Sequence, residues 1–483
     1  MLEDLIKERR RKLEFYLKNA DPYPAKVGRD FSICEILKNF SKLEKTKKSI
    51  FAAGRVRAWR DQGKILFGDI EDGSGRLQAV FNGKETAGFD LIKSTYDTGD
   101  FIEVFGKVFK TKRGEKSLSV KKARIIEKSL RPIPTDWYGL ADIETRLRKR
   151  YLDLILNSET KEIFLRKSVF WSAVRHYLEE AKFLEVETPV LESIPGGADA
   201  EPFKTHHSAL NTDFYLRISL ELPLKKLLVG GYEKVFEIGR IFRNEGIDKE
   251  HLQDYTQMEC YWAYADYEKM MKFTEGLYKA VIKKTFGGLK IKSGGRLIDW
   301  GRKWPKVDYC EILKKETGLD AISASADALR KKIKELKIET SLNLNNLGKG
   351  RLLDMIYKKT VRPKLVQPCF LMNPPVELEP LAKRLESNPN LVQRFQIVAT
   401  GTELGKGFSE LNDPIDQRRR FEEQTRLREA GDKEAQMLDE DFLEALEYGL
   451  PPAAGFGMSE RFFAVLMDKP LRETVIFPLM RPR

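Results

Sequence analysis

Short segments in which apolar and polar residues alternate fill residues 50–127. A period of two is typical of half-buried β-strands, and the glycines and aspartates between the segments are typical of tight turns. The five segments read I-F-A-A-G-R-V-R-A-W-R, K-I-L-F-G-D-I-E-D, G-R-L-Q-A-V-F, D-F-I-E-V-F-G-K-V-F-K and S-L-S-V-K-K-A-R-I-I-E. We therefore predict a small antiparallel barrel over residues 49–134, preceded over residues 1–48 by an extension that begins with a charged amphipathic helix.

Five strands at this spacing fit an OB-fold, in which aromatic side chains stack bases inside a basic groove. Plain structural explanations remain open for the individual side chains, because Phe67 could belong to the barrel core and Arg60 could be an ordinary surface charge. The barrel pattern favours nucleic-acid binding without deciding it.

The proline pair in L-R-P-I-P ends the barrel pattern, and residues 135–483 mix helical and strand patterns in a second, larger domain. Residues 160–183 predict a long helix followed by the strand F-L-E-V-E-T-P-V-L. The apolar stripe of this helix comprises Ile163, Phe164, Val169, Phe170, Val174 and Tyr177 or Leu178. A basic amphipathic helix over residues 325–338 indicates a helical insertion at about residues 300–350.

Residues 235–267 predict a strand, a polar loop and a second strand. The first arm, V-F-E-I-G-R-I-F-R, alternates apolar with polar or small residues, and the second is dense in aromatics around Glu259. Five polar or aromatic side chains then face a common space: Arg243, Glu245, His251, Tyr255 and Glu259. A guanidinium suits phosphate or carboxylate oxygens and an aromatic ring suits a base. A hairpin with a surface ion pair between Arg243 and Glu245 is the alternative.

Composition narrows the class of protein. The 483 residues suffice for two or three domains, and the formal charge of +13 favours a polyanionic partner, nucleic acid before membrane. A solvated lysine-rich surface gives the same charge. The cysteines stand singly, which indicates neither a zinc site nor a disulfide framework and makes a reducing cytoplasm the simplest setting. We expect no signal peptide, and no apolar run is long enough to span a bilayer.

The run F-R-N-E-G, with His251, Tyr255 and T-Q-M-E-C-Y after it, closely resembles the second signature motif of class II aminoacyl-tRNA synthetases, in the form carried by lysyl-tRNA synthetases. The helix, strand and proline that end at Pro189 resemble the first motif, and G-F-G-M-S-E-R-F-F-A-V-L-M, with Arg461, resembles the third. A lone G-F-G is weak, but three motifs in the family's order are specific. The resemblance implies an α+β protein: an OB-fold barrel followed by a catalytic domain on a mixed, mainly antiparallel sheet flanked by helices.

The resemblance also implies an activity. A lysine–tRNA ligase joins ATP and L-lysine to lysyl-adenylate with release of pyrophosphate, then transfers the lysyl group to the 3′ end of tRNA(Lys). Enzymes of this family are homodimers that meet through the first motif, and magnesium accompanies their ATP. Arg243, Glu403 and Arg461 are implied as catalytic residues.

Binding roles are implied residue by residue. The residues implied to bind ATP are Arg243, Glu245, His251, Tyr255, Glu403 and Arg461. Those implied to bind lysine are Gly197, Glu221, Glu259, Tyr261, Lys406 and Glu410. Magnesium is assigned to Glu403 and Glu410, and the anticodon to Arg60, Phe67 and Gln78. Phe67 would stack on a base, while Arg60 and Gln78 would hydrogen-bond base edges.

The chain departs from the family pattern at several positions. Gln396 stands where a glutamate is usual and Lys406 where an asparagine is usual, which alters the charge around the magnesium and the substrate carboxylate. Leu220 and Pro223 depart from the form P-E-L-Y around Glu221, and the third motif is one residue shorter between glycine and arginine.

Amino-acid choice depends on the charge of the pocket. Glu259 and Glu410 can pair with an ε-ammonium and repel an anionic side chain, so lysine is favoured over aspartate. Two alternatives stay open: a class II relative that charges another amino acid, and an RNA-binding paralogue that kept the barrel and lost catalysis.

Overall fold

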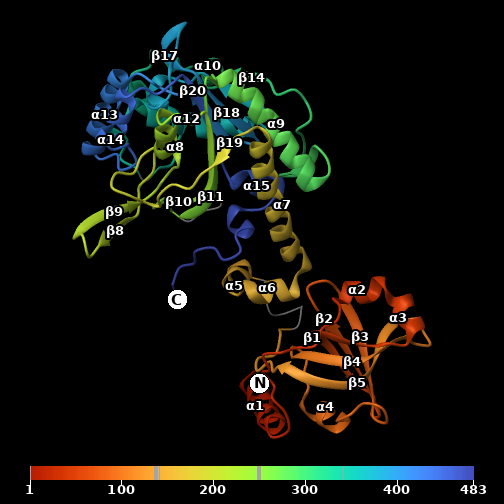
Figure 1. The fold of residues 1–483 in the computed structure, drawn as a ribbon. Coiled ribbons are helices and arrows are strands. Elements are labelled where there is room, and N and C mark those ends of the chain that lie inside the picture. Colours follow the sequence, from red (N-terminus) through yellow and green to blue (C-terminus); the bar gives the residue numbers. More distant parts are fainter. Residues whose placement is uncertain (1, 135–139, 141, 247–251, 341, 483) are drawn as a thin grey trace. The chain divides into compact units, whose positions relative to one another are not determined.

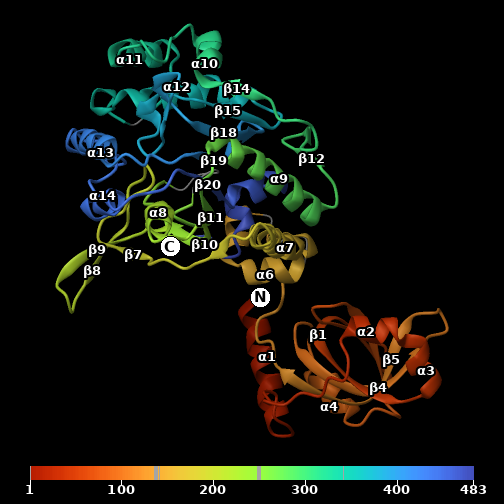
Figure 2. The same ribbon diagram turned by 45° about the horizontal axis from the view of Figure 1, so that its top comes forward.

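The computed structural model describes residues 2–134, 140, 142–246, 252–340 and 342–482. The chain divides into two compact units, Met1–Thr145 and Arg146–Arg483, each with its own hydrophobic core. Figures 1 and 2 show both units in two views. The domain limits drawn from the sequence remain predictions.

A closed barrel with the strand order β1-β2-β3-β5-β4 forms the centre of the first unit (Figure 1). Its strands are β1 (Ser49–Asp61), β2 (Ile65–Glu71), β3 (Arg76–Asn82), β4 (Phe101–Lys110) and β5 (Lys116–Glu127). β3 and β5 run parallel, and the other neighbours are antiparallel. Alternate residues point inward, so Leu66 and Ile70 are buried while Phe67 and Asp69 stay partly exposed. The predicted five-stranded barrel is confirmed.

Four helices accompany the barrel: α1 (Leu2–Leu17), α2 (Ile33–Lys38), α3 (Phe40–Thr46) and α4 (Phe89–Thr95). The basic helix α1 is tied to the barrel. Arg9 donates hydrogen bonds to the carbonyls of Thr98 and Ser129, both at 2.8 Å, and the hydroxyl of Tyr16 accepts one from the N–H of Ile125 at 2.9 Å. α1 therefore presents to solvent only the face opposite Arg9 and Tyr16.

An eight-stranded sheet with the order β14-β15-β18-β19-β20-β11-β10-β6 organises the second unit. Its strands are β6 (Leu184–Glu185), β10 (Lys234–Phe242), β11 (Asp254–Ala263), β14 (Lys306–Asp308), β15 (Cys369–Met372), β18 (Arg394–Ala399), β19 (Thr402–Ser409) and β20 (Ala453–Ser459). The pairs β14/β15 and β10/β6 are parallel and the other neighbours antiparallel. The predicted mixed, mainly antiparallel sheet is confirmed.

Short strands form three further small sheets: β7 (Leu191–Glu192), β8 (Lys204–His207) and β9 (Thr212–Leu216); β12 (Lys290–Ser293) and β13 (Arg296–Asp299); β16 (Arg384–Leu385) and β17 (Asn388–Val392). Single turns of 3-10 helix span Leu344–Asn346, Arg362–Lys364, Val376–Leu378 and Leu471–Thr474.

Helices cover both faces of the large sheet (Figure 2). They are α5 (Ile143–Arg148), α6 (Arg150–Leu156), α7 (Ser158–Glu180), α8 (Glu221–Val229), α9 (Tyr267–Phe286), α10 (Tyr309–Thr317), α11 (Ala326–Glu335), α12 (Lys349–Thr360), α13 (Pro414–Glu429), α14 (Glu440–Glu447) and α15 (Arg461–Leu466). α7 and α9 pack on one face, around Phe170, Met258 and Phe456. α8, α13 and α14 pack on the other, around Tyr261 and Phe442.

Two local expectations were wrong. Val169 does not join the buried stripe of α7: it is exposed, as is Leu165 one turn before it. The sequence of the third motif predicts a helix from Ser459 to Met467, but the helix begins at Arg461, because Ser459 still pairs with Gln257 in the β11/β20 ladder. No helix within the described ranges is long and apolar enough to cross a membrane.

Candidate active site

The central strands place three of the six residues predicted to bind lysine, Glu259, Tyr261 and Lys406, in two rows across the large sheet. From β10 to β18, one row of Cα partners is Glu237, Glu259, Gly457, Lys406 and Gln396, and the next is Val235, Tyr261, Gly455, Phe408 and Arg394. Side chains two residues apart on a strand share a face, so both rows point the same way. Tyr261 and Phe408 pack in the cluster with α8, and the candidate site therefore lies on the α8 face.

Glu259 lies at the centre of the first row and is almost fully buried. Its Oε1 accepts hydrogen bonds from the Ser219 hydroxyl at 2.7 Å, the Leu220 N–H at 3.0 Å and the Gln257 amide at 2.5 Å. Its Oε2 accepts one from the Tyr261 hydroxyl at 2.9 Å. All four of these donors are neutral groups.

Leu220 explains one departure from the family pattern. Its backbone N–H supplies one of the three donors to Glu259 Oε1. The family form P-E-L-Y has a proline at this position, and proline has no N–H to donate. Leu220 therefore adds a hydrogen bond that the usual sequence does not permit. Pro223, the other departure, lies in the first turn of α8, where a proline is tolerated.

Glu221 and Glu410 share a buried lysine. The Lys225 ammonium lies 2.6 Å from Oε1 of Glu221, one helical turn earlier on α8, and forms an ion pair with Oε2 of Glu410, which follows β19. All three side chains are buried, and the Phe408 and Phe442 rings lie 5.4 and 5.9 Å from the ammonium.

Gly197 packs directly against this group. Its φ is +82°, a conformation that L side chains rarely adopt, and an added Cβ would lie 2.8 Å from Cβ of Glu221 and 3.0 Å from that of Ser219. Only glycine allows the chain to pass this close to Glu221.

Arg243 and Arg461 both act on Tyr255. The Arg243 guanidinium lies 5.7 Å from the Tyr255 ring, and its Nε donates to the carbonyl of Ile218 at 3.2 Å. Burial raises the pKa of the Tyr255 hydroxyl, while the charges of Arg243 and Arg461 lower it. Glu245, partly exposed, acts on the same ring in the opposite direction. An aromatic ring with one guanidinium 5.7 Å away and a second whose charge acts on its hydroxyl suits a base and its phosphates.

Glu403 lies among cations rather than beside another acid. The β18/β19 register shifts between Ile397 and Val398, so Glu403 faces Val398 while Lys406 faces Gln396. Burial opposes ionisation of Glu403, but Arg394, a hydrogen bond from Gln396 and Lys406 together lower its pKa to about 2. The Lys406 ammonium itself lies 2.7 Å from Oε2 of the buried Glu379.

The two acids assigned to magnesium have different partners. Glu403 interacts with Gln396 and the surrounding cations, whereas Glu410 pairs with Lys225. Among the residues that the structure describes, no group of three or more His, Cys, Asp or Glu could hold a metal ion by itself. His251, assigned to ATP, lies outside the described residues.

The three anticodon candidates lie together on the barrel. Arg60 and Phe67 are Cα partners on β1 and β2, with the guanidinium 5.9 Å from the ring. Gln78 pairs with Asp69 on the next strand and accepts a hydrogen bond from the Ser117 hydroxyl at 2.9 Å. Phe67 is not part of the barrel core, so the core explanation for it is wrong.

Comparisons with known proteins agree with this geometry. Residues 142–481 match the family model described as "tRNA synthetases class II (D, K and N)", and residues 51–126 match the OB-fold nucleic acid binding domain. The chain belongs to the class II tRNA synthetases. It is 44% identical over its whole length to a lysine–tRNA ligase of Pelotomaculum thermopropionicum, of which the match covers 96%. It is 43% identical over its whole length to that of Roseiflexus castenholzii, with 99% covered, and 45% identical to that of Moorella thermoacetica, with 96% of this chain and 94% of the relative covered.

The residues predicted to bind the amino acid include three buried acids, Glu221, Glu259 and Glu410. Burial raises the pKa of Glu221 to about 7, with Lys225 opposing this and Glu259 adding to it. Burial likewise raises the pKa of Glu410 well above its ordinary value, against the effect of Lys225. Burial alone would lower the pKa of Lys225, but Glu221 and Glu410 raise it to about 12, so the lysine stays charged. The single positive charge of Lys225 thus does not balance both Glu221 and Glu410 when they are ionised.

Sequence analysis missed three polar residues of this synthetase site: Lys225, Glu379 and Ser219. Lys225 could have been found, because Glu221 and Lys225 have the i, i+4 spacing of a helical ion pair. No local pattern marks Glu379 or Ser219, since their partners, Lys406 and Glu259, lie far away along the chain.

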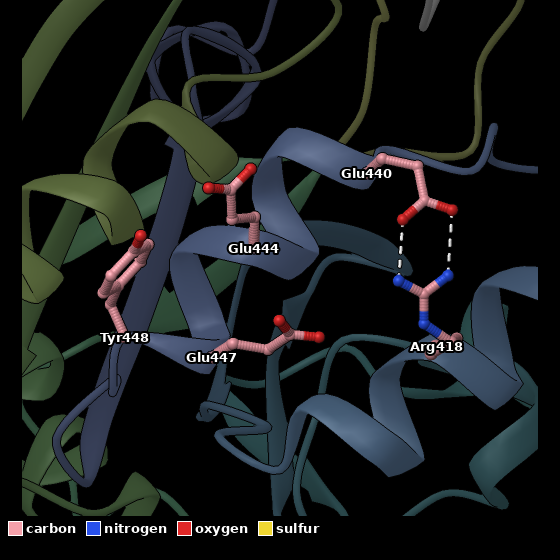
Figure 3. Close-up of a pocket in the computed structure, with 5 residues that line it drawn as sticks. All are labelled: Arg418, Glu440, Glu444, Glu447 and Tyr448. Atoms are coloured by element: carbon pink, nitrogen blue, oxygen red, sulfur yellow. Dashed lines mark hydrogen bonds and ion pairs between the residues drawn. The ribbon is translucent and has the colours of Figure 1, made fainter.

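A pocket of about 480 Å³ between α13 and α14 lies apart from these rows (Figure 3). Arg418 donates to both carboxylate oxygens of Glu440, at 2.8 and 2.7 Å, and Glu444, Glu447 and the largely exposed Tyr448 complete the lining. None of the predicted site residues lines it.

Proposed function

We propose that this chain is a lysine–tRNA ligase: it activates L-lysine with ATP and transfers the lysyl group to the 3′ end of tRNA(Lys). Relatives with this name match essentially the whole chain at 43–45% identity. The observation that carries the choice of lysine is the cluster of three buried acids, Glu221, Glu259 and Glu410, on the sheet face beside α8. An aspartate side chain would be repelled from this cluster.

Activation is an in-line displacement at the α-phosphorus by the carboxylate of the amino acid. It needs alignment and neutralisation of charge, not a protein nucleophile. We assign the bridge between α-phosphate and substrate carboxylate to Arg243. Tyr255 and Arg461 would enclose the adenine, with Glu245 and His251 orienting the nucleotide. The mutual interactions of Arg243, Tyr255 and Arg461 support this assignment.

We assign the amino acid to the acidic cluster. Glu221, with Gly197 against it, would hold the α-ammonium, while Glu259, Tyr261 and Glu410 would hold the ε-ammonium. Lys406 would approach the substrate carboxylate. Burial lowers the pKa of Lys406, but the pairing with Glu379 raises it by more, so the ammonium stays charged.

The residues present fit magnesium at one of the two assigned acids. Mg²⁺ is commonly held by one or two carboxylates together with substrate phosphates and water. Glu403 stays ionised and lies on the sheet near Lys406, so it would hold the ion with the triphosphate. Glu410 is committed to Lys225, and its role as a second ligand is the less well supported of the two. Bound magnesium would neutralise charge on the phosphates.

We further propose a homodimer in the cytoplasm. The first-motif segment exposes large apolar side chains that one chain leaves uncovered: Leu165, Val169, Leu184, Val190 and Leu191. Exposed apolar patches of this kind mark protein interfaces. All four cysteines are free thiols, as expected in a reducing compartment.

The direct test is amino-acid-dependent ATP–pyrophosphate exchange, measured with each of the twenty amino acids. Exchange with lysine alone is expected. Exchange with another amino acid would overturn the pocket assignment, and no exchange in the presence of magnesium and tRNA would favour the RNA-binding paralogue.

Arg243→Ala tests the mechanism in the same assay. We expect exchange to fall by roughly 10² to 10³, because a donor to the developing charge is lost. Arg240→Ala is the matched control, since Arg240 lies three residues earlier, near the end of β10, and pairs with Asp254 at the surface. Normal exchange by the Arg243 variant would refute the assigned role.

A further inference from the structure

Lys225 is a buried, charged side chain of the acidic cluster to which no role has been assigned so far. It lies on α8 with none of its side chain exposed, and its ammonium contacts Glu221 and Glu410 at once. A buried ammonium is stable only with such partners. Lys225 thus joins the acid assigned to the α-ammonium of lysine to an acid assigned to its ε-ammonium.

Hydrogen bonds and ion pairs connect the acids of the cluster, and Lys225 makes two of these contacts. Ser219 donates to Glu259 at 2.7 Å and accepts from the N–H of Glu221 at 3.3 Å. Lys225 links Glu221 to Glu410. Glu410 and the Tyr261 ring both lie close to Gly455, and Tyr261 donates to Glu259 at 2.9 Å. A change of charge at Lys225 therefore acts directly on Glu221 and Glu410.

The formal charge of the cluster matches the substrate. Glu221, Glu259 and Glu410 contribute three negative charges and Lys225 one positive charge, which leaves two negative charges. Lys406, 5.8 Å from the Phe408 ring, pairs with Glu379, and that pair adds no net charge. Free lysine carries two ammonium groups, and its carboxylate is assigned to Arg243 and Lys406.

We propose that Lys225 is a specificity-determining residue of the amino-acid site. Its internal ammonium reduces three buried acids to the two negative charges that the two ammonium groups of lysine neutralise, and it holds Glu221 and Glu410 at a fixed spacing. This inference rests on the proposed lysine–tRNA ligase function. Without Lys225, bound lysine leaves one buried carboxylate uncompensated, which weakens its binding.

The test compares Lys225→Met with Lys225→Arg in lysine-dependent exchange, with lysine affinity measured in parallel by calorimetry. We expect the Met variant to raise KM and Kd for lysine about tenfold or more, with a smaller change in kcat and in KM for ATP. The Arg variant keeps the charge and should stay within a few-fold of the wild type. Lys226→Met is the matched control, because Lys226 is the next residue and pairs with Asp441 at the surface.

Each outcome either supports or overturns the proposed role of Lys225. A Met variant with unchanged lysine affinity overturns the proposal, as does a parallel loss for lysine and ATP, which indicates a structural role. Lys225→Gln, whose amide can still donate to both carboxylates, replaces the Met variant if that does not fold. If both neutral variants fail to fold while the Arg variant folds, the charge serves the fold and the proposal is wrong. Wild-type protein inactive with lysine would instead overturn the proposed function.

Discussion

Glu192, at the end of β7, has a carboxylate oxygen that is buried without a hydrogen-bond donor among the described residues. Burial raises the pKa of Glu192 from its ordinary 4.5 to about 8, and the nearby Arg217 and Lys226 offset this only in part. The folded protein therefore keeps a proton on Glu192 between about pH 4.5 and pH 8, whereas the unfolded chain releases it.

Stability should depend on pH through this residue. Because the folded state binds the extra proton, the Glu192 contribution to the free energy of unfolding is fully present below pH 4.5 and is lost as the pH rises through about 8. Glu192→Gln is neutral at all pH values. We expect it to match the wild type at pH 4 and to be more stable at pH 8.5 by about 1–3 kcal/mol, the cost of an unsatisfied buried group.

Thermal melts of both proteins at the two pH values measure this difference. The comparison cancels every other titrating group that the two proteins share. Equal melting temperatures at pH 8.5 would show that the carboxylate finds a donor in solution.

At the scale of single elements, β20 lies between β11 and β19 in the part of the sheet that carries the proposed lysine site. Gly455 and Gly457 are Cα partners of Tyr261 and Glu259 on β11. They differ in the space around them. A Cβ on Gly455 would lie 2.3 Å from Oε1 of Glu410 and 2.4 Å from the Tyr261 ring, whereas one on Gly457 would lie 3.4 Å from the nearest atom, Cγ of Glu259.

Gly455→Ala should therefore disturb lysine binding. We expect KM for lysine in the exchange assay to rise by about 5- to 150-fold, as overpacking costs roughly 1–3 kcal/mol, with KM for ATP changed much less. Gly457→Ala on the same strand is the control and should stay within about threefold. Similar effects of the two substitutions would show that β20 shifts to make room for the added methyl group.

The sequence predicted elements better than it predicted which of their residues are buried. Period-two alternation correctly predicted the barrel strands, because their burial follows the pleat. Both arms of the hairpin also form strands, but in β11 the residues from Gln257 to Tyr261 are all buried, so its burial does not alternate. The alternation did not predict that Glu237 of β10 is buried, since Arg217 and Thr188, which bond its carboxylate, come from other segments. The start of α15 at Arg461 was missed for the same reason: Ser459 is held by a strand far away in the sequence.

In the candidate site, too, some residues were predicted from the sequence and others depend on tertiary contacts. Motif resemblance found Glu259, Tyr261 and Glu410, and the structure brings them together around Gly455. The cation that links the acids, Lys225, and the hydrogen bond from Leu220 to Glu259 depend on tertiary contacts. A motif identifies which residues belong to the site, but the charges and hydrogen bonds around those residues can be read only from the folded structure.

At the scale of the whole molecule, the two units have separate cores. The barrel core contains residues such as Leu66 and Ile102, and the cores of the second unit contain none of them. Units of this kind fold and function with considerable independence. A surface change on the barrel should therefore affect tRNA recognition and leave the activation of lysine unchanged.

Phe67→Ala separates the two steps. Phe67 is a partly exposed aromatic ring beside Arg60 on the outer face of the barrel, so it can stack on an anticodon base. Stacking on one base contributes about 1–3 kcal/mol, and we expect KM for tRNA(Lys) in the charging assay to rise about 5- to 150-fold. Lysine-dependent pyrophosphate exchange should not change.

Phe101→Ala is the control, because Phe101 lies on the same barrel and also has a guanidinium, that of Arg55, 4.2 Å from its ring. If the two variants lose charging equally, the loss reflects a weakened barrel, not a lost base contact. If Phe67→Ala also loses exchange, the barrel takes part in activation, and the independence of the two units does not hold. Loss of charging by Phe67→Ala alone, with exchange intact, assigns this face of the barrel to the anticodon.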